Sequence, residues 1–150
     1  MAISQTATTS FKVELLQAIH NFGPTSPNTF YIALYTSAAT IGPTTTVYTT
    51  SNEVSSVGTG YAAGGKELTI STSPTYGTNT SGTTTAYISF ATVSWPNSTF
   101  TVRGALIYNT TQGNKSVSVL DFGSDKILTD DTLQIIFPTP DANSAIVRIT

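Results

Sequence analysis

The only stretch with helical periodicity lies near the start of the chain, between residues 11 and 22. Its apolar side chains recur at spacings of four, four and three residues, which places them on one stripe of a helix: Phe11, Leu15, Ile19 and Phe22. Ser10 precedes the stretch as a candidate N-cap, and Gly23-Pro24 is a helix stop signal. The pattern predicts a helix over 11–22 whose apolar stripe lies on a sheet.

After Gly23-Pro24 the apolar positions alternate with polar ones, and turn-forming residues recur at short intervals. The alternation predicts strands at Phe30–Thr36, Val47–Thr50, Lys66–Thr72, Thr85–Phe90, Phe100–Asn109, Ser116–Phe122, Thr132–Phe137 and Ala145–Ile149. Short strands in this number are typical of a two-sheet antiparallel β-sandwich, here jelly-roll-like with one short N-terminal helix. We therefore expect an all-β fold with a single domain over residues 10–150.

Residues 1–9 are rich in threonine and show no periodicity, so they are set apart from the predicted domain as an N-terminal arm. This arm is either a frayed tail or a segment ordered only by a partner. The stretches Gly58–Gly65 and Ser71–Gly82 are predicted surface loops. Gly104 interrupts a predicted strand and indicates a bulge or a close backbone approach that would aim Arg103.

The composition shows how little charge the surface carries. Charged residues make up 9% of the chain, against roughly 25% in an ordinary soluble domain, and Thr and Ser together supply close to a third. Threonine suits exposed strand faces because its β-branched side chain fits a pleated surface without adding charge. Cysteine is absent, which excludes disulfides and thiolate nucleophiles. The composition argues against acid/base catalysis, and we expect neither enzyme activity nor a cofactor.

The basic residues are scattered along the chain: Lys12, Lys66, Arg103, Lys115, Lys126 and Arg148. A nucleic-acid surface needs clustered cations, so no nucleic-acid partner is expected. No apolar run approaches the roughly 20 residues that cross a membrane, so no membrane partner is expected either. The N-terminal residues show neither a basic nor an apolar signal region, so synthesis should end in the cytoplasm.

His20, the only histidine, has two interpretations. As a catalytic base it would need a nucleophile and an orienting carboxylate, which no local pattern supplies. As a cation at the end of the predicted helix it would interact favourably with the last carbonyl groups. We favour the second, structural interpretation.

The densest acidic group is Asp121, Asp125, Asp130 and Asp131. Carboxylates coordinate calcium, but the spacing does not match an EF-hand loop, and Gly123-Ser124-Asp125 and Thr129-Asp130-Asp131 are typical of turns between strands. The glutamates are too isolated to nominate a glycosidase pair, and Gly58–Gly65 lacks the sequence context of a phosphate-binding loop. We predict no metal site and no catalytic residue.

Tyr61, Tyr76 and Trp95 would stack on sugars if they lined an exposed groove, although Trp95 is more simply an edge-strand residue that caps the core. Protein interfaces are depleted in Lys, Glu and Asp and favour aromatic residues, and this chain has that bias throughout. The low charge therefore indicates either a surface that associates with other molecules or a threonine surface that only confers solubility.

Segments over most of the chain carry a family likeness: Phe11–Leu16, His20–Phe22, Thr29–Thr40, Asn52–Val54, Gly60–Gly65, Arg103–Asn109, Val119–Lys126 and Ile135–Pro138. Together they resemble small virion proteins of tailed bacteriophages. These motifs are structural and contain no catalytic signature.

The resemblance implies a capsid decoration or cement protein, a β-sandwich that binds the major capsid protein from outside and forms a homo-oligomer. It implies a place on the virion exterior after synthesis in the host cytoplasm. The residues then expected to contact partners are Ile3, Ser4, Gln5, Thr6, Glu53 and Tyr61. The alternative is a tail, neck or fibre-associated component, including a host-glycan-binding module.

Overall fold

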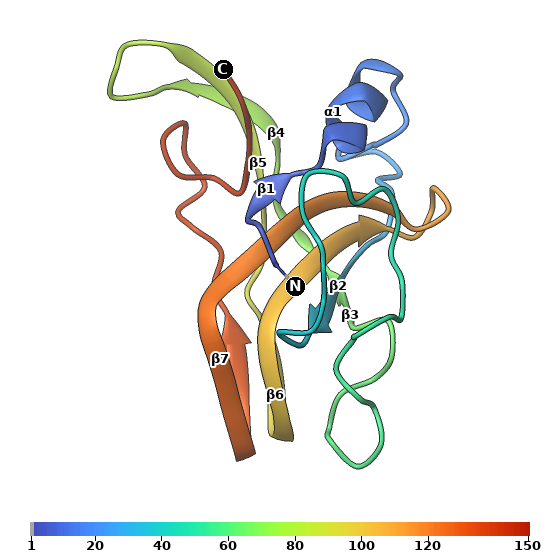
Figure 1. The fold of residues 1–150 in the computed structure, drawn as a ribbon. Helices are drawn as coiled ribbons and strands as arrows, with labels where there is room; N and C mark the ends of the chain where they lie inside the picture. Colours follow the sequence, from blue (N-terminus) through green and yellow to red (C-terminus); the bar gives the residue numbers. More distant parts are fainter. Residues whose placement is uncertain (1) are drawn as a thin grey trace.

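Two antiparallel β-sheets packed face to face form the protein, with one short helix near the N-terminus (Figure 1). The structure is a computed structural model and describes residues 2–150. The predicted all-β sandwich with a short N-terminal helix is confirmed. Met1 of the predicted N-terminal arm lies outside the described residues.

The larger sheet has five strands in the order β1-β7-β6-β2-β3. Their bounds are Thr6–Ala7 for β1, Lys115–Ile135 for β7, Val93–Asn109 for β6, Phe30–Tyr35 for β2 and Lys66–Leu68 for β3. β2 pairs with β6 along one edge and with β3 along the other, so it is an interior strand of the sheet.

The smaller sheet has three strands in the order β4-β5-β8. They span Ile70–Thr78, Thr84–Phe90 and Val147–Ile149. β4 occupies most of the stretch predicted as the loop Ser71–Gly82, so that prediction is wrong. The register of β4 shifts around Pro74 and most of its side chains are exposed, so its sequence lacks the alternation of a half-buried strand.

Three other predicted strands differ from the structure. Val47–Thr50 makes only one bridge, between Val47 and Lys115. Lys66–Thr72 is divided between β3 and β4, which belong to different sheets. Most of Thr132–Phe137 is the end of β7 and not a separate strand.

Aromatic and aliphatic side chains fill the space between the two sheets. The largest fully buried ones include Phe11, Phe30, Ile32, Leu34, Trp95, Val102 and Ile107. Phe22 and Phe30 stack with ring centroids 4.4 Å apart, and Phe90 contacts both rings. Full burial of one such side chain contributes about 1.5–3 kcal/mol, so this core is the main source of stability in a chain without disulfides.

A second apolar cluster covers the outer face of the five-stranded sheet. It contains Ala33, Tyr35, Ala39, Ile41, Leu106, Tyr108 and Val119. The loop of residues 36–54 passes over this face (Figure 1). Because β2 is covered on both faces, its sequence is a nearly continuous apolar run and not a strict alternation.

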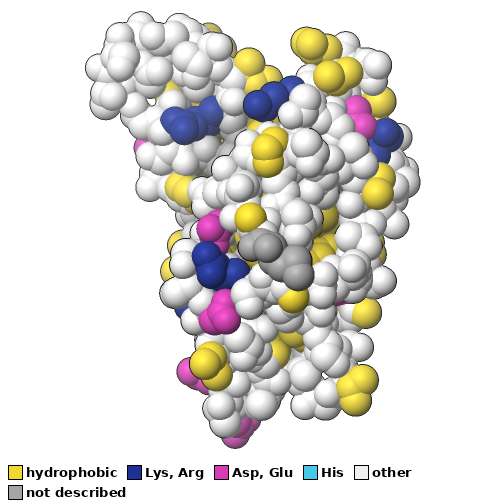
Figure 2. Space-filling view, in the orientation of Figure 1, with side chains coloured by type: hydrophobic (Ala, Val, Ile, Leu, Met, Phe, Trp, Pro, Cys, Tyr) yellow, Lys and Arg dark blue, Asp and Glu magenta, His cyan; other side chains and the backbone are white. Residues whose placement is uncertain are grey.

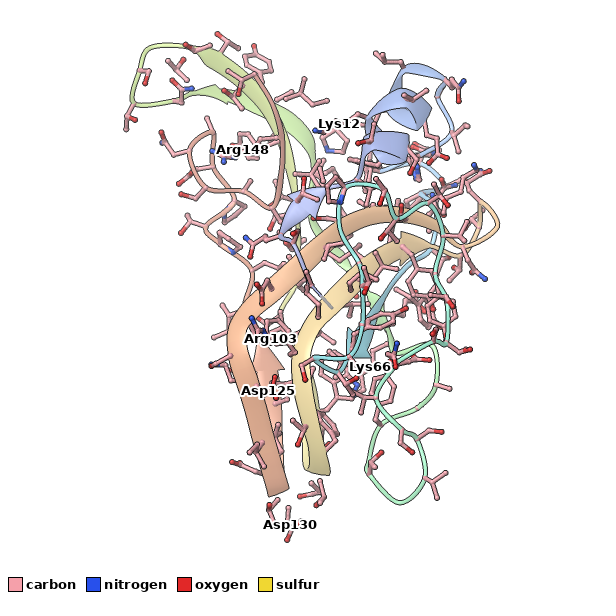
Figure 3. All side chains as sticks on the ribbon, in the orientation of Figure 1. Lys12, Lys66, Arg103, Asp125, Asp130 and Arg148 are labelled. Carbon is pink, nitrogen blue, oxygen red and sulfur yellow. The ribbon has the colours of Figure 1, made fainter. Side chains whose placement is uncertain are left out.

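β6 and β7 form one long two-stranded ribbon that bends back on itself. They pair along the full length of both strands, with a register shift on each side of Ser98. Near this point Asn97 and Asp130 have left-handed φ angles of 49° and 50°, which Asn and Asp adopt more readily than most residues. The arrowhead of β7 lies behind its first half (Figure 1), and Asp130 lies at the lower tip of the molecule (Figure 3). The predicted turn at Thr129-Asp130-Asp131 is therefore a bend within one strand.

A second irregularity in the ribbon places Arg103 beside Asp121. The register shifts between Val102 and Gly104, where β7 holds extra residues opposite Arg103. Arg103 Nε donates a hydrogen bond to Asp121 Oδ1 at 3.0 Å. The predicted bulge is confirmed, and Gly123-Ser124-Asp125 belongs to it, so the prediction of a turn between strands there is wrong.

The helix α1 spans Thr9–Leu16, so the prediction of a helix over 11–22 is wrong at its end. Thr8 caps it, and its hydroxyl accepts a hydrogen bond from the Phe11 N–H at 3.4 Å. A left-handed φ of 58° at Ala18 turns the chain back toward the sheets. Both ends of the predicted apolar stripe are nevertheless buried in the core.

A substitution at Gly65 tests how closely the loop before β3 approaches β2. Its φ is +83°, and an added Cβ would overlap the carbonyl group of Ile32. We expect Gly65→Ala to lower the free energy of unfolding by at least about 3 kcal/mol in urea denaturation.

Gly58→Ala is the matched control for this substitution. Gly58 also has a positive φ, +68°, but no atom lies within 4 Å of an added Cβ. The Gly58→Ala substitution should lower the free energy of unfolding only by the backbone strain, about 1–2 kcal/mol. Equal losses from the two substitutions would contradict the close approach at Gly65.

Candidate functional site

The N-terminal segment lies against the larger sheet and is held there by its own chain. Ile3 forms a parallel bridge with Ile41, and the Ser4 N–H donates to the Ile41 carbonyl at 3.0 Å. Thr6 pairs with β7 as part of β1. In the structure, residues 3–7 are therefore held by contacts within the chain. Among its predicted contact residues, Ser4 and Gln5 are exposed.

Glu53 and Tyr61, the other predicted contact residues, meet in a polar cluster. Glu53 Oε1 accepts hydrogen bonds from the Tyr61 hydroxyl at 2.6 Å and the Gly64 N–H at 2.7 Å. Glu53 Oε2 accepts one from the Tyr48 hydroxyl at 2.7 Å. The Tyr61 hydroxyl in turn accepts from the Leu34 N–H at 3.0 Å, which ties the loop that carries Tyr61 to β2.

This cluster stabilises the loop and offers little to a partner. Tyr61 is only 4% exposed, and burial together with the hydrogen bond to Glu53 raises its pKa well above the usual range. Trp95 is buried beside Tyr61, with ring centroids 6.4 Å apart. Of the three aromatic residues considered for a sugar-binding groove, only Tyr76 is exposed, so these residues form no such groove.

His20 lies in a buried polar chain that links α1 to the hairpin between β6 and β7. Its Nε2 donates to Glu14 Oε2 at 2.8 Å, and Lys115 Nζ donates to Glu14 Oε1 at 2.7 Å. Asn109 Nδ2 donates to His20 Nδ1 at 2.9 Å and to Asn28 Oδ1 at 2.9 Å. This pattern places the ring proton of neutral His20 on Nε2, facing the carboxylate.

Both ring nitrogens of His20 are therefore occupied by structural partners, and neither faces a hydroxyl group that it would activate. The prediction that His20 interacts with the end of a helix is wrong, because α1 ends at Leu16. Burial raises the pKa of Glu14, but the hydrogen bonds from Lys115 and His20 outweigh it and hold this pKa below its usual range.

The aspartates of β7 do not converge on a common point. Asp121 accepts hydrogen bonds from the Gly123 N–H and from Arg103, and these lower its pKa. Asp125 accepts from the Ser37 hydroxyl at 3.4 Å. Over residues 2–150, no group of three or more His, Asp or Glu side chains is placed to hold a metal ion.

On the front face of the molecule, charged and hydrophobic side chains are scattered among backbone and other, uncharged side chains (Figure 2). The cations labelled in Figure 3, among them Lys12, Lys66 and Arg148, lie on different parts of the surface. This view therefore shows no cationic stripe that would follow a phosphate backbone.

An open groove of about 840 Å³ lies along β7. Its walls come from the two arms of the bent strand and the residues that follow, 120–128 and 131–138, with Gln5 and Ile146. The apolar side chains in it include Leu120, Phe122, Leu128, Leu133, Ile135 and Phe137. We call this feature the edge groove. Among the predicted contact residues, only Gln5 lines it.

Two isoleucines in the walls of the edge groove are unusually exposed. Ile127 is 77% exposed on one arm and Ile136 is 70% exposed on the other. An exposed apolar groove is a typical feature of a binding surface. The edge groove is therefore the candidate functional site, and its exposed apolar walls are suited to binding.

The edge groove was not predicted from the sequence, although one signal points to it. Ile135, Ile136 and Phe137 are three consecutive apolar residues, and in a strand the middle one must face away from the other two. Ile135 and Phe137 are buried, so Ile136 faces solvent. This break in the alternation marks an exposed apolar position.

Comparison with known proteins gives no relative: no family model, no curated protein and no solved structure matches this chain. In the part of the chain that the structure describes, no helix is long and apolar enough to span a membrane.

The Glu14 carboxylate predicts how stability depends on pH. Its pKa is lower in the fold than the 4.5 of an ordinary glutamate, so its contribution is complete above about pH 4.5 and is lost as the pH falls through the folded value. We expect Glu14→Gln to lower the unfolding free energy at pH 7 by about 1–3 kcal/mol.

The same substitution should flatten the loss of stability below pH 4.5, as measured by denaturant unfolding over a pH series. Glu67→Gln is the control, because Glu67 is exposed on β3. If the unfolding free energy of Glu14→Gln fell below pH 4.5 as steeply as that of the natural chain, this role of Glu14 would be contradicted.

Proposed function

We propose that this chain is a bacteriophage virion protein that decorates the outside of the capsid and braces neighbouring capsid subunits. Its partner is the major capsid protein, and copies of the chain associate on the shell. It acts by binding alone and uses no cofactor. The resemblance of segments over most of the chain to small virion proteins of tailed phages supports this proposal.

The observation that carries the proposal is the edge groove, which has exposed apolar walls. Ile127 and Ile136 are exposed on its two arms, and burial of such side chains against a partner would be favourable. The one histidine is enclosed by structural hydrogen bonds on both ring nitrogens. The exposed apolar walls of the groove support a role in holding a protein surface.

The composition of the surface also supports a binding role. Only 9% of the residues are charged, so few long side chains must be desolvated or immobilised when a partner binds. Threonine and serine lose little side-chain freedom and still form hydrogen bonds. On a shell, weak contacts of this kind to several capsid subunits would add up by avidity.

Cryo-electron microscopy of phage particles that contain this chain tests the proposal. We expect density for the sandwich at symmetry-related positions over the outer face of the shell, in many copies per particle. A few copies at a single vertex would contradict decoration and indicate a tail or neck component. Density attached to no capsid subunit would contradict it as well.

A further inference from the structure

We propose that the edge groove binds an extended, positively charged polypeptide segment that carries apolar side chains at alternate positions. This inference rests on the proposed function, in which the segment belongs to the major capsid protein. It adds the chemical nature of the contact and names the surface that makes it.

The apolar lining of the groove favours a segment with apolar side chains at alternate positions. Leu128, Ile135 and Phe137 are buried at the base of its walls, whereas Ile127 and Ile136 are exposed on the two arms. A segment lying in the groove would contact apolar side chains from both stretches of its lining. An extended segment presents alternate side chains to one side, as this geometry requires.

The charges in the groove select a cationic partner. Three of the eight acidic residues of the chain line it, Asp121, Asp125 and Asp131, against one basic residue, Lys126. Asp121 is already paired with Arg103. Among the described residues, Asp125 and Asp131 have no Lys, Arg or His within 4 Å, so their charges remain for a partner.

The same charges argue against a second copy of this chain seated groove against groove. Two copies would bring Asp125 and Asp131 of one close to the same carboxylates of the other, and like charges at an interface are unfavourable. The volume of about 840 Å³ also lies in the range of sites that enclose a small ligand or a few side chains. A short extended segment therefore fits better than a folded face.

Binding of a defined peptide, followed by amide chemical shifts in nuclear magnetic resonance, tests this inference on the full chain. The probe is a short peptide in which lysine alternates with valine, and its control alternates glutamate with valine. We expect saturable shifts within residues 120–138 for the lysine peptide, which weaken as salt is added. Equal binding of both peptides, or shifts confined to other surfaces, would overturn the inference.

Variants of exposed residues separate the apolar contribution from the charge contribution without disturbing the core. Ile127→Ser combined with Ile136→Ser should weaken binding of the lysine peptide by about tenfold. Val57→Ser is the matched control, because Val57 is 86% exposed and lies outside the groove.

The charge contribution has its own pair of variants. Asp125→Asn combined with Asp131→Asn should reduce both the affinity for the lysine peptide and its salt dependence, whereas Glu67→Gln should change neither. Loss of binding in the control variants alone would overturn the assignment to this groove.

Two further measurements distinguish failure of this inference from failure of the proposed function. If the natural chain decorates particles and the Ile127→Ser, Ile136→Ser variant decorates them equally well, the groove is not the contact and the inference is overturned alone. If the lysine peptide binds the groove but the natural chain is missing from the shell, the capsid role fails and the ligand class remains supported. A dimer in sedimentation analysis that this double variant dissociates would show a second copy in the groove and overturn the inference.

Discussion

The bent ribbon of β6 and β7 is the constraint on which the rest of the structure depends. Its two strands pair along their whole length and provide the middle of the larger sheet. Val102 and Ile107 of the ribbon lie in the core, whereas Leu106 and Val119 belong to the outer cluster. The bend near Asn97 and Asp130 sets the two arms of β7 apart, and the space between them is the edge groove. The folding of this ribbon therefore creates the candidate site directly.

Sequence patterns were sufficient where a contact is local and insufficient where it joins distant parts of the chain. The strand at Phe30–Thr36 and the bulge at Gly104 follow from alternation and from a glycine within a strand, and both are confirmed. β4 was missed because most of its side chains are exposed, and a strand of this kind has no alternation to detect. The residues around Asp130 were predicted as a turn between strands, but they lie within β7, and their sequence could not reveal that the partner strand bends at the same place.

The polar networks and the candidate site were harder to predict than the strands. Glu14 meets Lys115 across 101 positions, so the buried network around His20 has no local signature. Glu53 and Tyr61 were predicted as contact residues and do lie together, but they bind each other. The edge groove combines Gln5 with two arms of β7. The apolar run at Ile135, Ile136 and Phe137 is the sequence signal that indicates it. The proposed function thus depends on how one surface is shaped and exposed.

Native-state hydrogen exchange tests the central role of the ribbon most directly. If the ribbon is one cooperative unit, amides on both sides of the bend, within 100–109 and 133–135, should exchange only through global unfolding and share its free energy. Amides of the β4–β5 hairpin, where most of β4 is exposed, should exchange through openings of lower free energy. Exchange of 133–135 through an independent local opening, while 100–109 remain protected, would contradict this account, because the bend would then be a loose attachment and the groove would have no fixed second wall.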